Sequence, residues 1–536
     1  MTKLPAAPPP LEALIGTSRA TIPDLLDARA RRSPRHPFVV QGESIWSYAG
    51  ALEEAEHFSG WALRRGVASD STRRIASFLP NRPEAMWAWF GSLLAGATYV
   101  PLNRAHRGMV LLDMLMRSRA EVLVTDREGL DLLPSLDCTA LDTVLVVDGE
   151  RSDRLDRIRI ASWQEVRDAP AVRGPSRAPS DPAELVYTSG TTGRSKAVLV
   201  PHNYLCRGAG WVAWSLSIGE DDVIHGWLPL YHIGGQVDMV LALLVGGGTV
   251  ALQPTFSRSR FWEQVEASGA TIFIGFSNVI EILWDLPARE DEAGTTLRAG
   301  IMGGIPPKLH RPFEERFGVN LFDVYGMTEA EPLALPWPGS RPPVDSVGRP
   351  SPDFEIAILG ADDEPVAPGQ SGQIAFRPRT ADVMLTTYED DDAAFVDATR
   401  NLWFHTGDLG RMDENGHVYF LDRFKHAIRR RGENISSFEL ERIIIQHESV
   451  RECCAVGVPS PVGEQDIKIV VVPDSGVEID PQELRAWCFE RMAHFMVPRY
   501  IELRDRLPRG PTGKVQKEGL GSVSAEVYDA EAVPTT

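Results

Sequence analysis

The segment that most constrains this chain is residues 184–201, which read ELVYTSGTTGRSKAVLVP. Short apolar runs at 184–187 and 197–200 predict two strands. The loop between them contains two glycines, four hydroxyl side chains and a lysine: Thr188, Ser189, Gly190, Thr191, Thr192, Gly193 and Lys196. Glycine lets a backbone turn tightly against a ligand, and hydroxyls with free backbone N–H groups suit polyphosphate oxygens. Surface hairpins share this composition, so only the exact order of residues in the loop favours a phosphate site.

Three better-known motifs are absent from the sequence or out of place in it. The Walker A spacing G-x-x-x-x-G-K-[ST] does not occur, and the flanks of the loop are two strands rather than a strand and a helix. Residues 246–251, GGGTVA, follow a helical run and precede a strand, which is the reverse of a dinucleotide-binding unit. No G-x-S-x-G sequence is present, so hydrolase chemistry of that type loses its main support.

Length and composition indicate a multidomain globular protein. A chain of 536 residues is too long for one ordinary core, and 43% hydrophobic with 24% charged residues is typical of such proteins. The net charge of −19 argues against a general nucleic-acid binder. The 5 cysteines include no CxxC pair, so neither a zinc knuckle nor a disulfide framework is indicated. The N-terminus carries prolines where a signal peptide needs its apolar core, so we expect a cytoplasmic protein without membrane contact. Nothing in the sequence indicates the oligomeric state.

Helix and strand patterns alternate along the first three hundred residues. Strands are predicted at 74–79, 122–125 and 143–147, and helices at 83–95 and 203–216. This alternation predicts parallel sheets with helices on both faces. Trp87, Trp89 and Phe90 recur at near-helical spacing in the first of these helices, where we expect core packing rather than ligand contacts.

Two later strands end in residues suited to a ligand. A strand at 297–302 ends in Gly303, Gly304, Ile305 and Pro306, and the carboxyl ends of strands in an open α/β sheet are where a flat ligand binds. A second strand, 319–324, leads into the run Tyr325, Gly326, Met327, Thr328 and Glu329. A tyrosine can stack on a purine, and a glutamate is a hard oxygen ligand for Mg²⁺.

These motifs identify a family. YTSGTTGRSK and YGMTE closely resemble the signatures of the adenylate-forming superfamily, which comprises acyl-CoA synthetases, peptide-synthetase adenylation domains and firefly luciferase. Ser195 and Ala197 replace a proline and a glycine that are usual at the loop exit. The resemblance covers about residues 25–520. The segments FSRSRFWEQV and RRRGENISSFELE look closest to carnitine/crotonobetaine-CoA-ligase-like enzymes.

The resemblance implies an α/β fold of two domains. A large N-terminal domain, residues 1–422, would hold two parallel-type α/β sheet subdomains and a small β-barrel-like subdomain. A small α+β domain, residues 423–536, would move about a hinge near Lys425 and carry the catalytic Lys514 in the context LPRGPTGKV. Two departures from the hinge motif are His426 for a common aspartate and Arg431 for a common glycine, the latter in a loop that lines the thiol tunnel of relatives.

The resemblance also assigns roles to individual residues. Thr328 and Glu329 would act at the α-phosphate and on Mg²⁺, with His232 gating the carboxylate pocket. The nucleotide would be bound by Thr188, Ser189, Gly190, Thr191, Thr192, Lys196, Gly303, Gly304, Ile305, Pro306, Asp323, Tyr325, Gly326, Met327, Asp408 and Arg423. We expect the ribose at Asp408, on a tight turn. The acid pocket would include Trp227, His232, Gln236, Phe276, Asn278 and Glu331.

The implied reaction has two steps and uses ATP, Mg²⁺ and coenzyme A. A small-to-medium carboxylic acid attacks the α-phosphate, releases pyrophosphate and forms an acyl-adenylate, and the thiol of coenzyme A then takes the acyl group. Two alternatives stay open. The adenylate could pass to a carrier-protein thiol or an amine, or the activated group could be a small oxyanion such as nitrite. The second alternative is a regulator that binds nucleotide without catalysing a reaction. The presence of Lys514, Glu329 and Asp408 argues against it.

Overall fold

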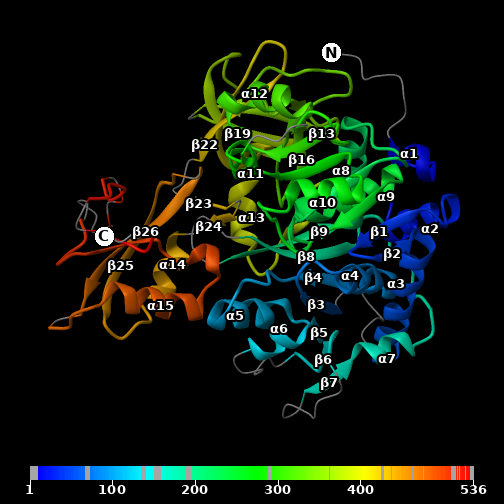
Figure 1. The fold of residues 1–536 in the computed structure, drawn as a ribbon, viewed down its shortest axis with the longest axis horizontal. Helices are drawn as coiled ribbons and strands as arrows, with labels where there is room; N and C mark the ends of the chain where they lie inside the picture. The colour runs from blue at the N-terminus through cyan, green and yellow to red at the C-terminus, as the bar shows by residue number, and fades with distance from the viewer. Residues whose placement is uncertain are drawn as a thin grey trace.

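A computed structural model describes most of the chain (Figure 1). The described residues are 10–66, 73–133, 140–149, 158–188, 195–287, 292–360, 362–423, 428–431, 433–435, 437–461, 463–474, 476–508, 515, 517, 519–524 and 527–531. Their arrangement confirms the predicted α/β fold, with two mostly parallel sheets, a curled antiparallel sheet and a C-terminal α+β domain.

The first large sheet has 8 strands in the order β20-β9-β8-β4-β3-β5-β6-β7. It contains both strands that flank the predicted phosphate loop, and these pair antiparallel with Thr188 opposite Lys196. The strands are β3 (Arg74–Phe78), β4 (Thr98–Pro101), β5 (Val122–Thr125), β6 (Thr143–Val146), β7 (Arg159–Ser162), β8 (Pro182–Thr188), β9 (Lys196–Pro201) and β20 (Thr387–Tyr388). Strand β3 is buried along its whole length, with Ile75 in one apolar layer and Ala76 and Phe78 in the other.

The second large sheet has 7 strands in the order β14-β13-β12-β10-β11-β1-β2. All neighbouring pairs are parallel except β1 and β2, which form an antiparallel hairpin. The strands are β1 (Pro37–Gln41), β2 (Ser44–Ser47), β10 (Val223–Gly226), β11 (Thr249–Leu252), β12 (Ile272–Phe276), β13 (Ala299–Gly303) and β14 (Asn320–Asp323). Their carboxyl ends carry the Gly303–Pro306 loop and Asp323 to one edge of the sheet.

Helices cover both large sheets. Those of the N-terminal part are α1 (Pro10–Ile15), α2 (Ile22–Arg32), α3 (Tyr48–Leu63), α4 (Pro83–Ala95), α5 (Gly108–Ser118), α6 (Arg127–Asp131), α7 (Trp163–Arg167), α8 (His202–Ser215), the π-helix η1 (Gly235–Leu241), α9 (Ala242–Gly246), α10 (Phe261–Ser268), α11 (Ser277–Trp284), α12 (Pro307–Phe317), α13 (Asp392–Ala398) and the 3₁₀ turn η2 (Arg400–Leu402). Trp87, Trp89 and Phe90 of α4 are buried in the core, as expected.

Two smaller antiparallel sheets follow the second large sheet in sequence. One has the order β15-β16-β17, from Tyr325–Met327, Ala330–Leu335 and Arg349–Pro350. The other has the order β18-β19-β21-β22, from Phe354–Leu359, Ser371–Pro378, Phe404–Met412 and Val418–Arg423. The β18-β19-β21-β22 sheet corresponds to the predicted barrel-like subdomain. Its register shifts between Gln373 and Ala375, opposite residues 405–409 of β21, so β21 bends there.

The C-terminal domain lies at one side of the larger domain, with the hairpin of β23 (Ile428–Arg430) and β24 (Glu433–Ile435) between them (Figure 1). Its sheet has the order β25-β26-β27-β28, from Val450–Pro459, Gln465–Pro473, Tyr500–Leu503 and Tyr528–Asp529. Helices α14 (Ser437–Ile444) and α15 (Pro481–Arg491) and the 3₁₀ turn η3 (His494–Met496) complete it.

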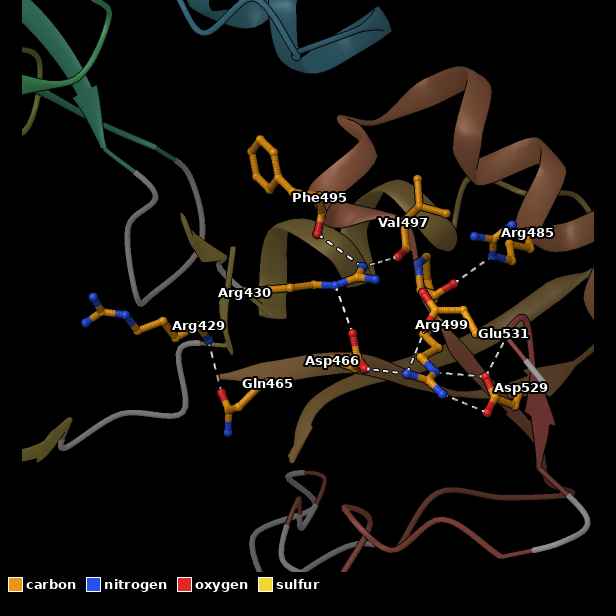
Figure 2. A network of polar contacts seen from close by, with 11 residues as sticks. Arg429, Arg430, Gln465, Asp466, Arg485, Phe495, Val497, Arg499, Asp529 and Glu531 are labelled. Atoms are coloured by element: carbon orange, nitrogen blue, oxygen red, sulfur yellow. Dashed lines mark hydrogen bonds and ion pairs between the residues drawn. The ribbon is translucent and has the colours of Figure 1, made fainter. Parts of the chain in front are cut away.

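A buried network of charges joins the strands of this domain (Figure 2). Asp466 of β26 pairs with Arg430 of β23 at 3.2 Å and with Arg499 at 3.0 Å. Arg430 also donates to the backbone carbonyls of Phe495 and Val497, at 3.3 and 2.5 Å. Arg499 pairs in addition with Asp529 and Glu531 at the sheet edge. The network therefore ties the hairpin to the core of the small domain.

Among the described residues, the helices all fall short of the length and apolarity that a membrane span requires.

Candidate active site

A cavity of about 860 Å³ lies where the large sheets, the antiparallel sheets and the C-terminal hairpin meet. Its walls include fifteen of the predicted site residues: Thr188, Lys196, His232, Phe276, Gly303, Gly304, Ile305, Asp323, Tyr325, Gly326, Met327, Thr328, Glu329, Glu331 and Asp408. From Thr188 to Asp408, these residues span more than two hundred positions in the sequence. The fold brings the phosphate-loop strands, the Gly303–Ile305 loop and the Tyr325–Glu329 segment into one space.

Several predicted residues fall outside the described part of the chain. These are Ser189, Gly190, Thr191, Thr192, Lys425 and Lys514, together with the side chains of Asn278 and Arg423. The backbone of Arg423 is described, and it lies opposite Asp408 in the antiparallel pairing of β21 and β22. The roles assigned to all these residues stay predictions.

Three predicted residues lie beside the cavity rather than on its wall. Trp227 packs among His225, Phe256 and Phe261, with Gly275 between its ring and the cavity. Gln236 is fully buried in η1. Pro306 precedes α12 as its N-cap residue. Of the residues predicted for the acid pocket, His232, Phe276 and Glu331 line the cavity, while Trp227 and Gln236 lie behind its wall.

Asp323 shapes the loop predicted to contact adenine. Its carboxylate accepts the backbone N–H of Gly304 at 2.8 Å and that of Ile305 at 3.0 Å. Gly304 has a φ of +84°, a conformation that glycine adopts without strain. Burial raises the pKa of Asp323 to about 6, against the opposing effect of the two N–H donors. The carboxylate thus holds the loop in place at the end of β13.

Asp408 and Tyr325 are joined directly. The Tyr325 hydroxyl donates to Asp408 Oδ2 at 2.7 Å, which connects β15 to β21 across the cavity. Asp408 was predicted on a tight turn, and this is wrong: the residue lies within β21, next to Gly407 at a φ of +76°. The pairing of β19 with β21 shifts its register near this residue. Such an irregularity bends a strand and changes the direction of its side chains. Asp408 lines the cavity.

Glu329 is held by a residue that sequence reasoning missed. The hydroxyl of Tyr388, from the two-residue strand β20, donates to Glu329 Oε1 at 2.7 Å. Lys196 Nζ lies 4.2 Å from the centre of the Tyr388 ring. Burial raises the pKa of Tyr388 and the Glu329 carboxylate raises it further, so the phenol keeps its proton as a donor. A two-residue strand has no periodicity that a sequence pattern could reveal.

The residues around Glu329 fit a magnesium ion that is bound together with a nucleotide. Mg²⁺ is usually bound by one or two carboxylates plus substrate phosphates and water. Glu329 lines the cavity with one oxygen bound to Tyr388, and Thr188 and Lys196 lie on the same wall. The described residues contain no cluster of three or more His, Cys, Asp or Glu that would form a complete protein cage. The donors therefore suit an ion shared with phosphates.

The C-terminal hairpin closes one side of the cavity. Arg429 donates through Nη2 to the carbonyl oxygen of Gly303 at 3.2 Å and pairs with Glu464 at 3.3 Å. Ile435, Phe495 and Met496 of the same domain also line the cavity. Arg431 lies exposed at the turn of the hairpin with a φ of +54°, in the left-handed region that favours glycine. Hence the hairpin, rather than the sheet of the small domain, faces the site.

Sequence comparisons define the class of protein. The model of the AMP-binding enzyme family matches residues 26–386, and that of the AMP-binding enzyme C-terminal domain matches residues 439–514. The chain therefore belongs to the AMP-binding enzyme family, among its adenylate-forming acid–CoA ligases, and is an AMP-forming enzyme.

Two curated relatives align over nearly the whole chain. The crotonobetaine/carnitine–CoA ligase of Citrobacter koseri is 32% identical over 483 residues, which are 89% of this chain and 93% of the relative. The sulfoacetate–CoA ligase of Cupriavidus necator is 30% identical over 502 residues, 93% of this chain and 96% of the relative.

A solved relative shows a similar domain arrangement. A double mutant of o-succinylbenzoate CoA synthetase from Bacillus subtilis, bound to a product analogue named OSB-NCoA, superposes with a TM-score of 0.79 at 25% identity, covering 93% of this chain and 98% of that one. The same synthetase in complex with AMP gives a TM-score of 0.65 over 95% and 99% of the two chains. The arrangement of this chain is closer to the form with the product analogue.

Replacing Tyr388 with phenylalanine is expected to lower kcat/KM for MgATP about tenfold or more, because Glu329 loses a hydrogen bond to a charged acceptor. Steady-state kinetics at saturating acid measure the effect. The matched control is Tyr419→Phe, which removes a hydroxyl that donates to Asp413 outside the cavity. Equal kcat/KM values for Tyr388→Phe and the unaltered enzyme would show that Glu329 does not depend on the hydrogen bond from Tyr388.

Proposed function

We propose that this enzyme activates a small-to-medium carboxylic acid with MgATP and transfers the acyl group to coenzyme A. The observation that carries the proposal is the meeting of Glu329, the Tyr325–Asp408 pair and the Gly303–Ile305 loop in one cavity that the C-terminal hairpin closes. Similarity to ligases that use coenzyme A supports the acceptor.

In the first step, the acid binds beside His232 and Phe276, and its carboxylate attacks the α-phosphate of ATP. The Gly303–Ile305 loop and Tyr325 bind adenine, and Asp408 accepts hydrogen bonds from the ribose hydroxyls. Thr188–Thr192 and Lys196 bind the phosphates that leave as pyrophosphate. Mg²⁺ at Glu329 supplies charge neutralisation on those phosphates when it is bound. Lys514 donates to the oxygens on which charge develops, and such fixed donors usually provide the largest part of the rate gain.

In the second step, the small domain turns about Lys425, which withdraws Lys514 and brings the β23–β24 hairpin to the cavity. The described arrangement fits this second state, since Arg429 and Ile435 of the hairpin lie at the site. The higher likeness to the synthetase with the product analogue agrees with it. The thiol of coenzyme A then attacks the acyl carbonyl and AMP leaves. Domain movements of this kind commonly separate two half-reactions.

The test is a product analysis with purified enzyme, ATP, Mg²⁺ and a panel of acids, with and without coenzyme A. We expect acid-dependent release of pyrophosphate, and AMP together with an acyl-CoA thioester when coenzyme A is present. Pyrophosphate without any thioester would replace coenzyme A by another acceptor, such as a carrier-protein thiol or an amine. Absence of pyrophosphate with every acid, and with nitrite, would refute the proposal.

A further inference from the structure

Two carboxylates stand together in the wall of the cavity, and the reaction described above uses neither. Asp238 comes from the π-helix η1 and is 6% exposed, while Glu331 comes from β16 and is 8% exposed. Both line the cavity. Side chains of this kind are almost never buried without a partner. Their burial beside a ligand cavity therefore calls for a partner from the ligand.

The contacts of the two side chains place them at the acid end of the cavity. The Glu331 carboxylate lies so close to Gly326 that a Cβ atom there would collide with it. Asp238 Oδ2 is 3.4 Å from the position that a Cβ atom of Gly234 would take. Gly326 belongs to the Tyr325–Glu329 segment, and Gly234 follows His232. The pair thus lies between the segment that contacts the α-phosphate and the segment predicted to gate the acid.

No positive charge of the protein balances this pair within the described part of the chain. None of the ion pairs found among the described residues includes Asp238 or Glu331, and Asp238 Oδ1 is buried without a hydrogen-bond partner. Burial disfavours the charged form of the Asp238 carboxyl group and raises its pKa to about 8. Burial raises the pKa of the Tyr204 phenol, and the nearby carboxyl groups of Glu331, Glu329, Asp238 and Glu184 raise it further, so the surroundings are acidic.

The kind of ligand that suits such a site follows from its chemistry. Two close carboxylates in a dry wall repel each other, and a cation between them removes that cost. An oxygen without a partner needs an N–H or O–H donor. A quaternary ammonium has no N–H group to donate to either carboxylate and is bound mainly by aromatic faces. A protonated primary or secondary amine meets both requirements.

We propose that the acid activated by this enzyme carries a protonated primary or secondary amine, which the carboxylates of Asp238 and Glu331 bind. The inference rests on the proposed function, because it concerns the acid that is adenylated. An acid of this kind differs from the acids with a quaternary ammonium group and from those with anionic groups alone. The proposal does not depend on which group accepts the acyl group.

The first experiment compares three matched sets of acids with the unaltered enzyme. One set holds alanine and the amino acids from 3-aminopropanoate to 6-aminohexanoate. The second replaces each ammonium by methyl, for example pentanoate for 4-aminobutanoate, and the third carries trimethylammonium. We expect at least one ammonium acid to exceed its methyl and trimethyl counterparts about 100-fold in kcat/KM for pyrophosphate release, because a site built for a donor rejects analogues that lack it.

The second experiment uses the variants Asp238→Asn and Glu331→Gln, which keep shape and remove charge. Each is expected to lose about 10- to 100-fold of the preference for the ammonium acid over its methyl counterpart, because kcat/KM falls more for the ammonium acid than for the methyl acid. Asp397→Asn, a carboxylate on the α13 side of the same cavity, is the matched control and should leave the preference unchanged. Melting temperatures show whether each variant folds.

The outcomes separate the two proposals. Activity only with methyl or trimethyl acids, or an unchanged preference in both variants, refutes the amine proposal and leaves the ligase proposal intact. Absence of pyrophosphate release with all acids refutes the ligase proposal. If Asp238→Asn fails to fold, the preference of the unaltered enzyme and that of Glu331→Gln decide the question.

Discussion

Replacing Lys514 with alanine is expected to slow acyl-adenylate formation by about 10²–10³-fold or more, the effect of removing one donor that acts on transition-state charge. The residue lies in the LPRGPTGKV segment, outside the described residues, and its role comes from the family resemblance. Pyrophosphate release at saturating ATP and acid measures this step. The loss should appear in kcat, since the lysine acts where charge develops during the attack.

The second half-reaction provides the decisive comparison for the same variant. Thioester formation from a premade acyl-adenylate should proceed at nearly the unaltered rate, because the proposed mechanism withdraws Lys514 before the thiol enters. Lys308→Ala, which removes an exposed lysine of α12, controls for the loss of one positive charge. An equal loss in both half-reactions would contradict the assignment of one domain arrangement to each step.

Replacing Asp466 with alanine is expected to destabilise the C-terminal domain by about 3–5 kcal/mol, because it leaves buried Arg430 without its carboxylate partner. Burial already lowers the pKa of Arg430, and Asp466 opposes that shift. Arg499 would keep Asp529 and Glu531, so most of the cost falls on Arg430 (Figure 2). Chemical denaturation measures the total loss, and hydrogen exchange in β25 and β26 locates it.

A partner at the edge of the same network serves as the control. Asp529 pairs with Arg499 at 2.9 Å, but its side chain is 23% exposed. Asp529→Ala should therefore cost about 1 kcal/mol or less, the usual range of exposed pairs. Similar losses in the two variants would mean that burial of Arg430 does not determine the stability of this domain.

The sequence predicted the elements whose periodicity is long or whose burial is complete. Helix α4 and strand β5 have the bounds that the pattern predicts, because apolar residues dominate both of them and proline or glycine stands nearby. The two strands that flank the phosphate segment are also confirmed. The division of the chain at residue 422 stays a prediction.

The errors and omissions have physical reasons. Trp227 was expected in the acid pocket, but its ring packs in an aromatic cluster behind Gly275 and does not line the cavity. Asp238 was missed because residues 235–241 form a π-helix, whose wider turn presents a different set of side chains from the α-helical pattern. Tyr388 was missed because it reaches Glu329 only through tertiary structure.

The two halves of the cavity differ in how far they are organised before any ligand arrives. Asp323, Asp408 and Glu329 each accept a hydrogen bond from a neighbouring group of the protein, so the nucleotide meets side chains that are already immobilised. Each rotamer fixed in advance spares about 0.5–1.5 kcal/mol on binding. At another part of the cavity wall, Asp238 and Glu331 form no ion pair with any described residue. Evolution could thus exchange one acid for another at positions 238 and 331 while the nucleotide chemistry stayed unaltered.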